Sequence, residues 1–202
     1  MMGGRKYNVV IFGADGCTGR YTVEAMVEYN KTLQNKKTIT WAVAGRSDDE
    51  LKEALADVSV YTGTVESLKF QLLSSSFIII ITFIGVDCRS VERLIADAAD
   101  LSALIKVASA CEILISCVGP FRFYGDNVLQ ACLSQKTHYI GAGGELQYLM
   151  ESQMRFNHAA EANGMYMVES CGMASIFADC GTLFLQENIK GKRFAFKSVN
   201  VK

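Results

Sequence analysis

Near its amino terminus the chain reads Tyr7-Asn8-Val9-Val10-Ile11-Phe12, followed at once by Gly13-Ala14-Asp15-Gly16-Cys17-Thr18-Gly19. The first stretch is short, apolar and rich in β-branched residues, a pattern that predicts a buried strand. From Thr18 to about Asn30 apolar residues recur at helical spacing, so the glycines stand between a strand and a helix. In that setting a Gly-x-x-Gly-x-x-Gly spacing predicts a loop that binds the pyrophosphate of a dinucleotide. The alternative is a glycine-rich turn without a ligand.

The three glycines have separate roles in this prediction. Gly13 permits the tight turn after the strand, Gly16 lets the backbone approach the pyrophosphate, and Gly19 lets the helix lie close to the sheet. The start of the helix supplies free amides and a partial positive charge for the phosphates. We therefore expect cofactor contacts from the whole loop, namely Gly13, Asp15, Gly16, Cys17, Thr18 and Gly19.

The end of the second predicted strand, residues 39–44, indicates which nucleotide binds. An acid at this position would accept a hydrogen bond from the ribose 2′-hydroxyl of NAD, but the chain has Gly45-Arg46-Ser47. An arginine can pair with a 2′-phosphate, which favours NADP over NAD, with Arg46 and Ser47 as contacts. The alternative is that Arg46 is a solvated surface residue and that Asp48 or Asp49 takes the ribose hydroxyl.

A later strand, residues 113–118, is closed by Cys117-Val118-Gly119-Pro120. Ligands of open α/β sheets lie along the carboxyl edge at which such a strand ends, so we expect cofactor contacts from Cys117, Val118, Gly119 and Pro120. The aromatic stretch 121–126 that follows would either form a wall beside the nicotinamide or cover the start of a helix.

Strands and helices alternate along most of the remaining chain. Further strands are predicted at 138–140 and 165–168, and helices at 127–134 with Asp126 as the cap, 146–163 and 175–187. This alternation predicts β-α-β units, and thus an α/β protein with a Rossmann-type, doubly wound parallel sheet. Residues 57–89 fit no clean pattern and look irregular or inserted, and 91–96 are too weakly apolar for an assignment. The apolar run 77–86 is far shorter than the roughly 20 residues of a membrane span, which favours a buried strand over a membrane contact.

The end of the chain follows a different pattern. Residues 193–201 alternate with period two, which predicts a half-exposed strand of antiparallel type. We therefore expect a nucleotide-binding domain over 1–190 and, over 191–202, the first strand of a second domain that the chain does not complete.

Composition excludes several classes of function. Twenty basic residues stand against 21 acidic residues, a formal net charge of −1 that offers no basic surface to nucleic acid. Seven cysteines form no Cys-x-x-Cys pair, and with only two histidines we expect no metal site. Unpaired cysteines and the lack of a secretory signal in the first apolar run favour a reducing, intracellular compartment.

The glycine loop, the stretch 41–46 and the stretch 117–125 together resemble the saccharopine dehydrogenase-like oxidoreductases, a family similar to the trans-acting enoyl reductases of lipid synthesis. The signature Gly-Pro-aromatic-x-x-Tyr-Gly at 119–125 is more specific than the glycine loop, and 137–139, 144–145 and 172–179 also match. The resemblance implies a Rossmann domain, a nicotinamide cofactor and a second, mostly β domain in members about twice as long. For animal members it also implies lipid-related roles at lipid droplets or mitochondria, besides the cytosol.

This chain departs from the family pattern at four positions. Glycines 141 and 143 replace an acid and a hydroxyl, Ala174 replaces an aspartate, and Phe177 replaces a proline. One hypothesis is therefore an NADP-dependent oxidoreductase acting on a small-molecule or lipid substrate, with Tyr124, Glu145 and His138 as candidate proton donors but no catalytic residue assigned. A second is a catalytically inactive nucleotide-binding or membrane-surface scaffold, in contact with a membrane or lipid droplet or assembled as an oligomer. A third is a nucleotide sensor like the atypical short-chain reductases.

Overall fold

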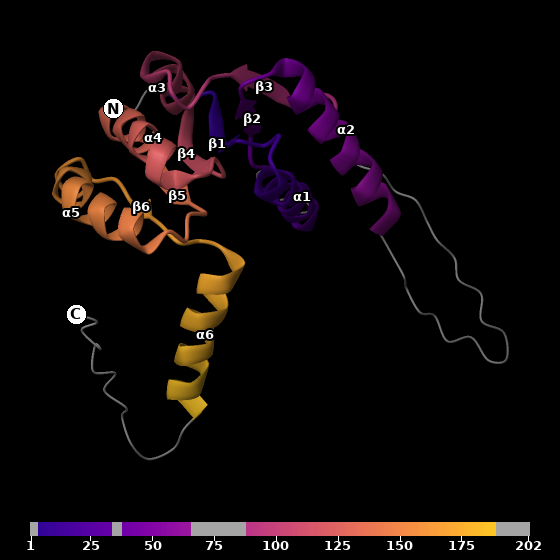
Figure 1. Cartoon of the computed structure of the whole chain (residues 1–202). Helices are drawn as coiled ribbons and strands as arrows, with labels where there is room; N and C mark the ends of the chain where they lie inside the picture. Colours follow the sequence, from indigo (N-terminus) through magenta and orange to yellow (C-terminus); the bar gives the residue numbers. More distant parts are fainter. Residues whose placement is uncertain (1–3, 34–37, 66–87, 189–202) are drawn as a thin grey trace, which may run out of the picture.

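The structure is a computed structural model that describes residues 4–33, 38–65 and 88–188 of the chain. Its centre is a six-stranded sheet with the order β3-β2-β1-β4-β5-β6, in which every neighbouring pair is parallel (Figure 1). This order and direction confirm the predicted Rossmann-type fold. The strands are β1 (Tyr7–Phe12), β2 (Trp41–Gly45), β3 (Glu92–Ile95), β4 (Cys111–Ser116), β5 (His138–Gly141) and β6 (Met167–Val168).

Helices cover both faces of the sheet. Side chains alternate along β1, so that Val9 and Ile11 face α1 (Cys17–Thr32) and α2 (Asp48–Val65). Val10 and Phe12 face the other layer, which contains α3 (Leu101–Ala110), α4 (Phe121–Gln135) and α5 (Leu146–Ala162). Because β1 is covered on both faces, its run of apolar residues needs no polar alternation.

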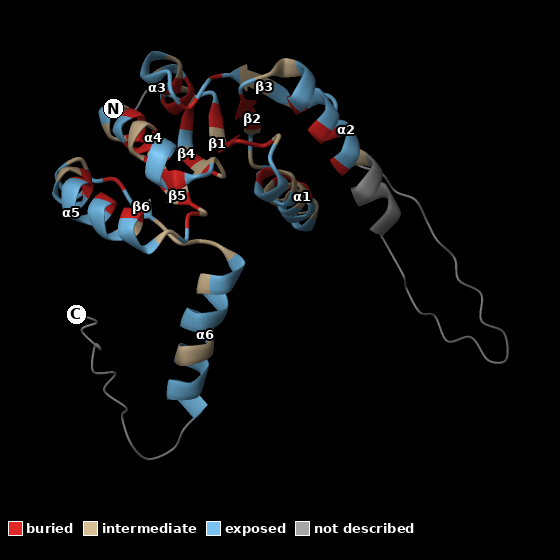
Figure 2. Cartoon of the chain, in the orientation of Figure 1, coloured by how far each residue is buried: buried red, intermediate tan, exposed pale blue. Residues whose placement is uncertain are grey.

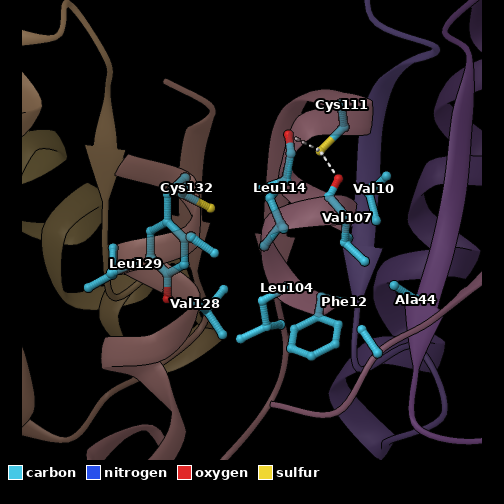
Figure 3. Packing of buried hydrophobic residues seen from close by; sticks show 14 of the residues in the cluster. Val10, Phe12, Ala44, Leu104, Val107, Cys111, Leu114, Val128, Leu129 and Cys132 are labelled. Carbon is cyan, nitrogen blue, oxygen red and sulfur yellow. Dashed lines mark hydrogen bonds between the residues drawn. The ribbon is translucent and has the colours of Figure 1, made fainter. Parts of the chain in front are cut away.

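The larger of the two apolar clusters holds the site-bearing strands in place (Figure 3). Phe12 of β1 and Leu114 of β4 pack with Leu104 of α3 and Val128 of α4, and none of the four is more than 1% exposed. This core fixes how β1 is aligned with its neighbours β2 and β4. Phe12 pairs with Ala44 on one side and with Ser116 on the other, so β1, β2 and β4 end at one edge of the sheet. The loops that follow these strands therefore meet.

The structure corrects two details of the sequence prediction. The helix expected at 127–134 begins at Phe121 with Pro120 as its N-cap, and Asp126 is not a cap but lies within α4, where its carboxylate pairs with Arg155 of α5. The weakly apolar residues 92–95 form β3, because pairing with β2 supplies the hydrogen bonds that the apolar pattern did not indicate.

Part of the region 57–89 forms regular structure, although residues 88 and 89 lie in a loop and a turn before β3. Helix α2 continues to Val65. The apolar run 77–86 and the expected strand at 193–201 lie outside the described residues.

The last described helix, α6 (Met173–Asn188), has no buried residue (Figure 2). It exposes large apolar side chains, listed here with their exposed fractions: Met173 76%, Ile176 50%, Phe177 72%, Leu183 56%, Phe184 64% and Leu185 55%. Across the described ranges, no helix combines the length and the apolar character that a bilayer crossing requires.

Candidate functional site

A cleft of about 490 Å³ opens at the carboxyl edge of the sheet, where β1, β2 and β4 end. The glycine loop, the residues after β2 and the residues after β4 all contribute to its lining. Eight of the predicted cofactor contacts meet there, namely Gly13, Asp15, Gly16, Arg46, Cys117, Val118, Gly119 and Pro120. The other four, Cys17, Thr18, Gly19 and Ser47, do not line the cleft: the first three belong to the first turn of α1, and Ser47 precedes α2.

The fold requires glycine at two of the three glycine positions in the loop, and for different reasons. Gly13 has a φ of +80°, and a Cβ there would lie 2.7 Å from Cγ2 of Val118. A Cβ at Gly19 would lie 2.0 Å from the carbonyl oxygen of Gly13, so only glycine lets α1 rest on the loop. A Cβ at Gly16 would meet nothing nearer than that same oxygen at 3.4 Å, an ordinary contact. The fold therefore requires glycine at 13 and 19, whereas at 16 it leaves room for a side chain.

Helix α1 begins without a side-chain cap. Its N-cap is Gly16, which has no side chain to accept from the first free amides, and its first turn carries no acid. By contrast, Asp100 accepts hydrogen bonds from Ser102 and Ala103 at the start of α3. Uncapped amides and the helix dipole make the start of α1 suitable for an anion such as a pyrophosphate.

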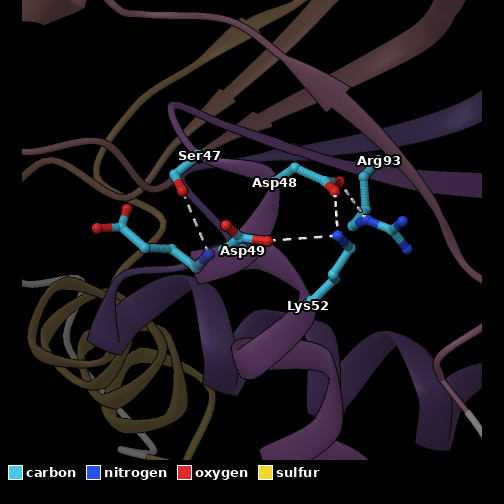
Figure 4. Close-up of polar contacts among 6 residues, drawn as sticks. Ser47, Asp48, Asp49, Lys52 and Arg93 are labelled. Carbon is cyan, nitrogen blue, oxygen red and sulfur yellow. Dashed lines mark hydrogen bonds and ion pairs between the residues drawn. The ribbon is translucent and has the colours of Figure 1, made fainter.

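Of the four residues after β2, Arg46 lines the cleft. The other three make polar contacts elsewhere, which Figure 4 shows. Ser47 accepts a hydrogen bond from the amide of Glu50 at 3.4 Å and so caps α2. Asp48 pairs with Lys52 at 2.6 Å and with Arg93 at 2.6 Å, and these two cations lower the pKa of its carboxyl. Asp49 pairs with Lys52 at 3.3 Å. Arg46, in contrast, is exposed, lines the cleft and makes no ion pair with a described residue. This arrangement favours the arginine over the two aspartates as the group beside the adenosine ribose.

The opposite wall follows β4. The amide of Cys117 donates to the carbonyl of Phe12 at 2.8 Å, and its half-buried thiol lies 3.4 Å from the Thr22 hydroxyl, with a pKa raised by burial. Of the aromatic residues that follow, Tyr124 lines the cleft and is 37% exposed. Phe121 is buried against Tyr148, with 5.8 Å between ring centroids, and covers the start of α4 as one sequence interpretation expected.

Two of the three candidate proton donors have structural partners. Glu145 accepts a hydrogen bond from the amide of Phe121 at 2.7 Å and so satisfies the start of α4. A proton donor would have to lie near the carboxyl edge of the sheet, but His138 is the first residue of β5, at the amino edge, where its Nδ1 accepts from the amide of Tyr166 at 3.0 Å. Only Tyr124 of these candidates lines the cleft.

A buried polar cluster at the end of β5 was missed by sequence reasoning. The Tyr148 hydroxyl donates to Glu169 Oε1 at 2.9 Å, and burial raises the pKa of Glu169 to about 7. A Cβ at Gly141 would lie 2.1 Å from Glu169 Oε2 and 2.8 Å from the Tyr139 hydroxyl. The carboxylate of Glu169 therefore fills the space above Gly141, where the resemblance led us to expect an acid. The glycine at 141, in place of the family's acid, was the sequence signal for this change. Only the fold shows that Glu169 supplies the carboxylate instead.

Within the described ranges, no group of three or more His, Cys, Asp or Glu side chains is arranged to hold a metal ion. The cleft is lined instead by the N-cap of α1, by one guanidinium, that of Arg46, and by the Tyr124 side chain. An uncapped helix start and a guanidinium both suit a phosphate-bearing cofactor.

Comparison with known families decides the assignment. Residues 9–168 match the family described as the saccharopine dehydrogenase NADP binding domain. The chain belongs to this family. Membership confirms the resemblance inferred from the three sequence stretches and NADP as the cofactor. The described fold is thus that of a saccharopine dehydrogenase-like, NADP-binding domain of oxidoreductases.

Several relatives share the whole of this domain. The lipid droplet localized protein of Caenorhabditis elegans is 31% identical over 92% of this chain and 38% of its own length. The saccharopine dehydrogenase-like oxidoreductase of Homo sapiens is 30% identical over 96% of this chain and 41% of its own length. Among solved structures, apo saccharopine dehydrogenase (L-Glu forming) from Saccharomyces cerevisiae superposes with a TM-score of 0.58 at 14% identity, covering 91% of this chain and 31% of that one. This likeness concerns the fold. The chain spans well under half the length of these relatives.

Proposed function

We propose that this chain is the nucleotide-binding part of an NADP-dependent oxidoreductase. One observation carries the proposal: Gly16, the N-cap that leaves the start of α1 without a side-chain cap, and Arg46, whose guanidinium pairs with no described residue, line a single cleft. The helix start and Gly16 would hold the pyrophosphate, and Arg46 would hold the 2′-phosphate. When bound, the cofactor supplies or accepts a hydride, and the protein orients it.

The substrate is proposed to be a small molecule or a lipid. The name of the nematode relative, a lipid droplet localized protein, supports the lipid. Tyr124 is the proposed proton donor, since it combines a suitable hydroxyl with a place on the cleft wall. The described residues contain no disulfide, which supports action in a reducing, intracellular compartment: the cytosol, the lipid droplet surface or the mitochondrion.

A second function, nucleotide binding without catalysis, is favoured by the positions and hydrogen bonds of Glu145 and His138, the other two candidate proton donors. Glu145 Oε1 accepts from an amide of α4 and His138 Nδ1 from an amide beside β6, and neither residue lines the cleft. A scaffold at a membrane surface or an oligomer would need the cleft only to bind nucleotide.

Titration of the 202-residue chain with NADPH and with NADH, followed by the fluorescence of the reduced nicotinamide and by calorimetry, tests the shared part of both functions. We expect NADPH to bind, and a protein that binds neither nucleotide would contradict both. Turnover is then measured on the longer protein of the kind that the relatives represent, with carbonyl and enoyl compounds, lipids among them, as acceptors. Oxidation of NADPH that is lost in Tyr124→Phe supports the oxidoreductase, whereas binding without oxidation supports the scaffold.

A further inference from the structure

An acidic side chain stands at the end of β2, although the sequence has none there. Asp15 belongs to the glycine loop, yet its carboxylate lies over Gly45, the last residue of β2. A Cβ at Gly45 would be 2.8 Å from Asp15 Oδ1 and 3.4 Å from Asp15 Cγ. The absence of a side chain at 45 is what makes room for this carboxylate.

Asp15 and Arg46 flank Gly45 on the same wall of the cleft. The Asp15 carboxylate makes no hydrogen bond or ion pair with any residue that the structure describes, and the same holds for the Arg46 guanidinium. Arg20 lies nearby, but its Nε donates to the Asp15 carbonyl oxygen at 3.3 Å and its guanidinium pairs with Asp57. Hence Arg20 does not neutralise the Asp15 side chain.

The third charged group on the cleft wall is Asp97, which follows β3. Its Oδ1 accepts a hydrogen bond from the amide of Ala99 at 2.8 Å, so part of its acceptor capacity is used within its own loop. Asp15 is therefore the carboxylate with both oxygens available at the place where a strand-end acid would meet the adenosine ribose.

We propose that Asp15 is a specificity-determining residue of the nucleotide site, one that accepts a hydrogen bond from a ribose hydroxyl and opposes the 2′-phosphate by like charge. The inference rests on the proposed function, because it needs a nucleotide in the cleft. Arg46 attracts the 2′-phosphate and Asp15 repels it. The protein then distinguishes NADPH from NADH less strongly than the arginine alone would allow.

The test compares Asp15→Asn with the unaltered chain, by titration with NADPH and with NADH. The substitution removes the charge and keeps the size of the side chain. We expect the ratio of the two dissociation constants, NADH over NADPH, to rise about tenfold, because a partly exposed charge pair at such a site is worth roughly that factor. NADPH should bind more tightly, while NADH loses a charged acceptor and binds no better. Asp15→Thr should change the ratio in the same direction, and thermal unfolding verifies that both variants fold.

Asp49→Asn is the matched control. It removes one negative charge from the same end of the molecule, from a side chain that is 95% exposed and outside the cleft lining. A ratio in Asp15→Asn that stays within about twofold of the unaltered chain, or that moves no more than in Asp49→Asn, overturns the inference and leaves the proposed function intact. If the unaltered chain binds neither nucleotide, the proposed function itself is wrong and this inference falls with it.

Discussion

At Gly16 a substitution should affect ligand binding without affecting folding. The protein leaves ordinary contact space at this position, with 3.4 Å to the nearest oxygen, and its φ of −77° suits any residue. We expect Gly16→Val to fold normally but to block the approach of a pyrophosphate, so that NADPH affinity falls by about a hundredfold or more while the melting temperature changes little. Calorimetric titration and thermal unfolding measure the two quantities.

Gly144→Val is the control for this substitution. A Cβ at Gly144 would meet nothing within 4 Å, and the residue does not line the cleft, so nucleotide affinity should be unchanged. An unchanged NADPH affinity in Gly16→Val would show that the glycine loop does not bind the pyrophosphate.

Arg46 is expected to make the protein selective for NADPH over NADH. A charge-assisted contact with a phosphate contributes about 1.5–3 kcal/mol, so Arg46→Ala should weaken NADPH by about ten- to a hundredfold and leave NADH nearly unaffected. Equal losses for both nucleotides would assign Arg46 to a part of the cofactor that they share. Lys106→Ala, which removes a positive charge from α3 outside the cleft, should affect neither.

At the scale of elements, α6 differs from α1 and α3–α5 because none of its side chains is buried. Phe184 of α6 is 64% exposed, whereas Phe156 of α5 is 7% exposed. We expect Phe156→Ala to lower the free energy of unfolding by about 3–5 kcal/mol, and Phe184→Ala to change it by less than about 0.5 kcal/mol. Chemical denaturation measures both.

The same exposed face predicts self-association. Exposed apolar side chains gathered on one helix promote contacts between molecules, so Phe177→Ser combined with Phe184→Ser should shift the chain toward monomer in sedimentation velocity without lowering its melting temperature. A large loss of stability in these variants would show instead that α6 packs against the rest of the chain.

At the scale of the whole molecule, the cluster around Glu169 joins β4, β5, α5 and the loop after β6 through buried polar groups. Tyr148 donates to the carboxylate, while the Tyr139 and Ser116 hydroxyls are buried beside it. Burial raises the pKa of Glu169 from 4.5 to about 7, so between these values the folded state holds a proton that the unfolded state has lost. The free energy of unfolding therefore falls as pH rises from about 4.5 to about 7.

Glu169→Gln tests this pH dependence. One pKa unit corresponds to about 1.4 kcal/mol, and because Glu169 is only half-buried we expect a loss of about 1–2 kcal/mol across this interval. The neutral glutamine should remove most of that slope in urea denaturation measured at a series of pH values. Glu151→Gln, on the exposed side of α5, serves as the control. A slope that persists in Glu169→Gln would mean that another group carries it.

Local sequence was sufficient for the elements that carry their own signals. The β-branched strand, the three glycines and the following helix lie within one continuous stretch, and the alternation of strands and helices leads to a parallel sheet. Helix α4 was placed too late, since Asp126 is a typical cap residue, but its side chain is taken by Arg155 from another helix. Strand β3 was missed because none of its residues is buried and no apolar pattern marks it; its hydrogen bonds to the neighbouring strand β2 form it.

The sequence by itself determined the fold class, the glycine loop and the presence of an arginine in place of an acid after the second strand, because each depends on residues adjacent in the chain. Only the tertiary structure decided what the remaining polar groups do. It engaged Asp48, Glu145 and His138 with partners from other segments, and it placed Asp15 over Gly45 and Glu169 over Gly141. These roles arise where segments far apart in the chain come within a few ångströms of each other, and the distance between two such side chains is set by how the strands and helices pack, which no local pattern contains.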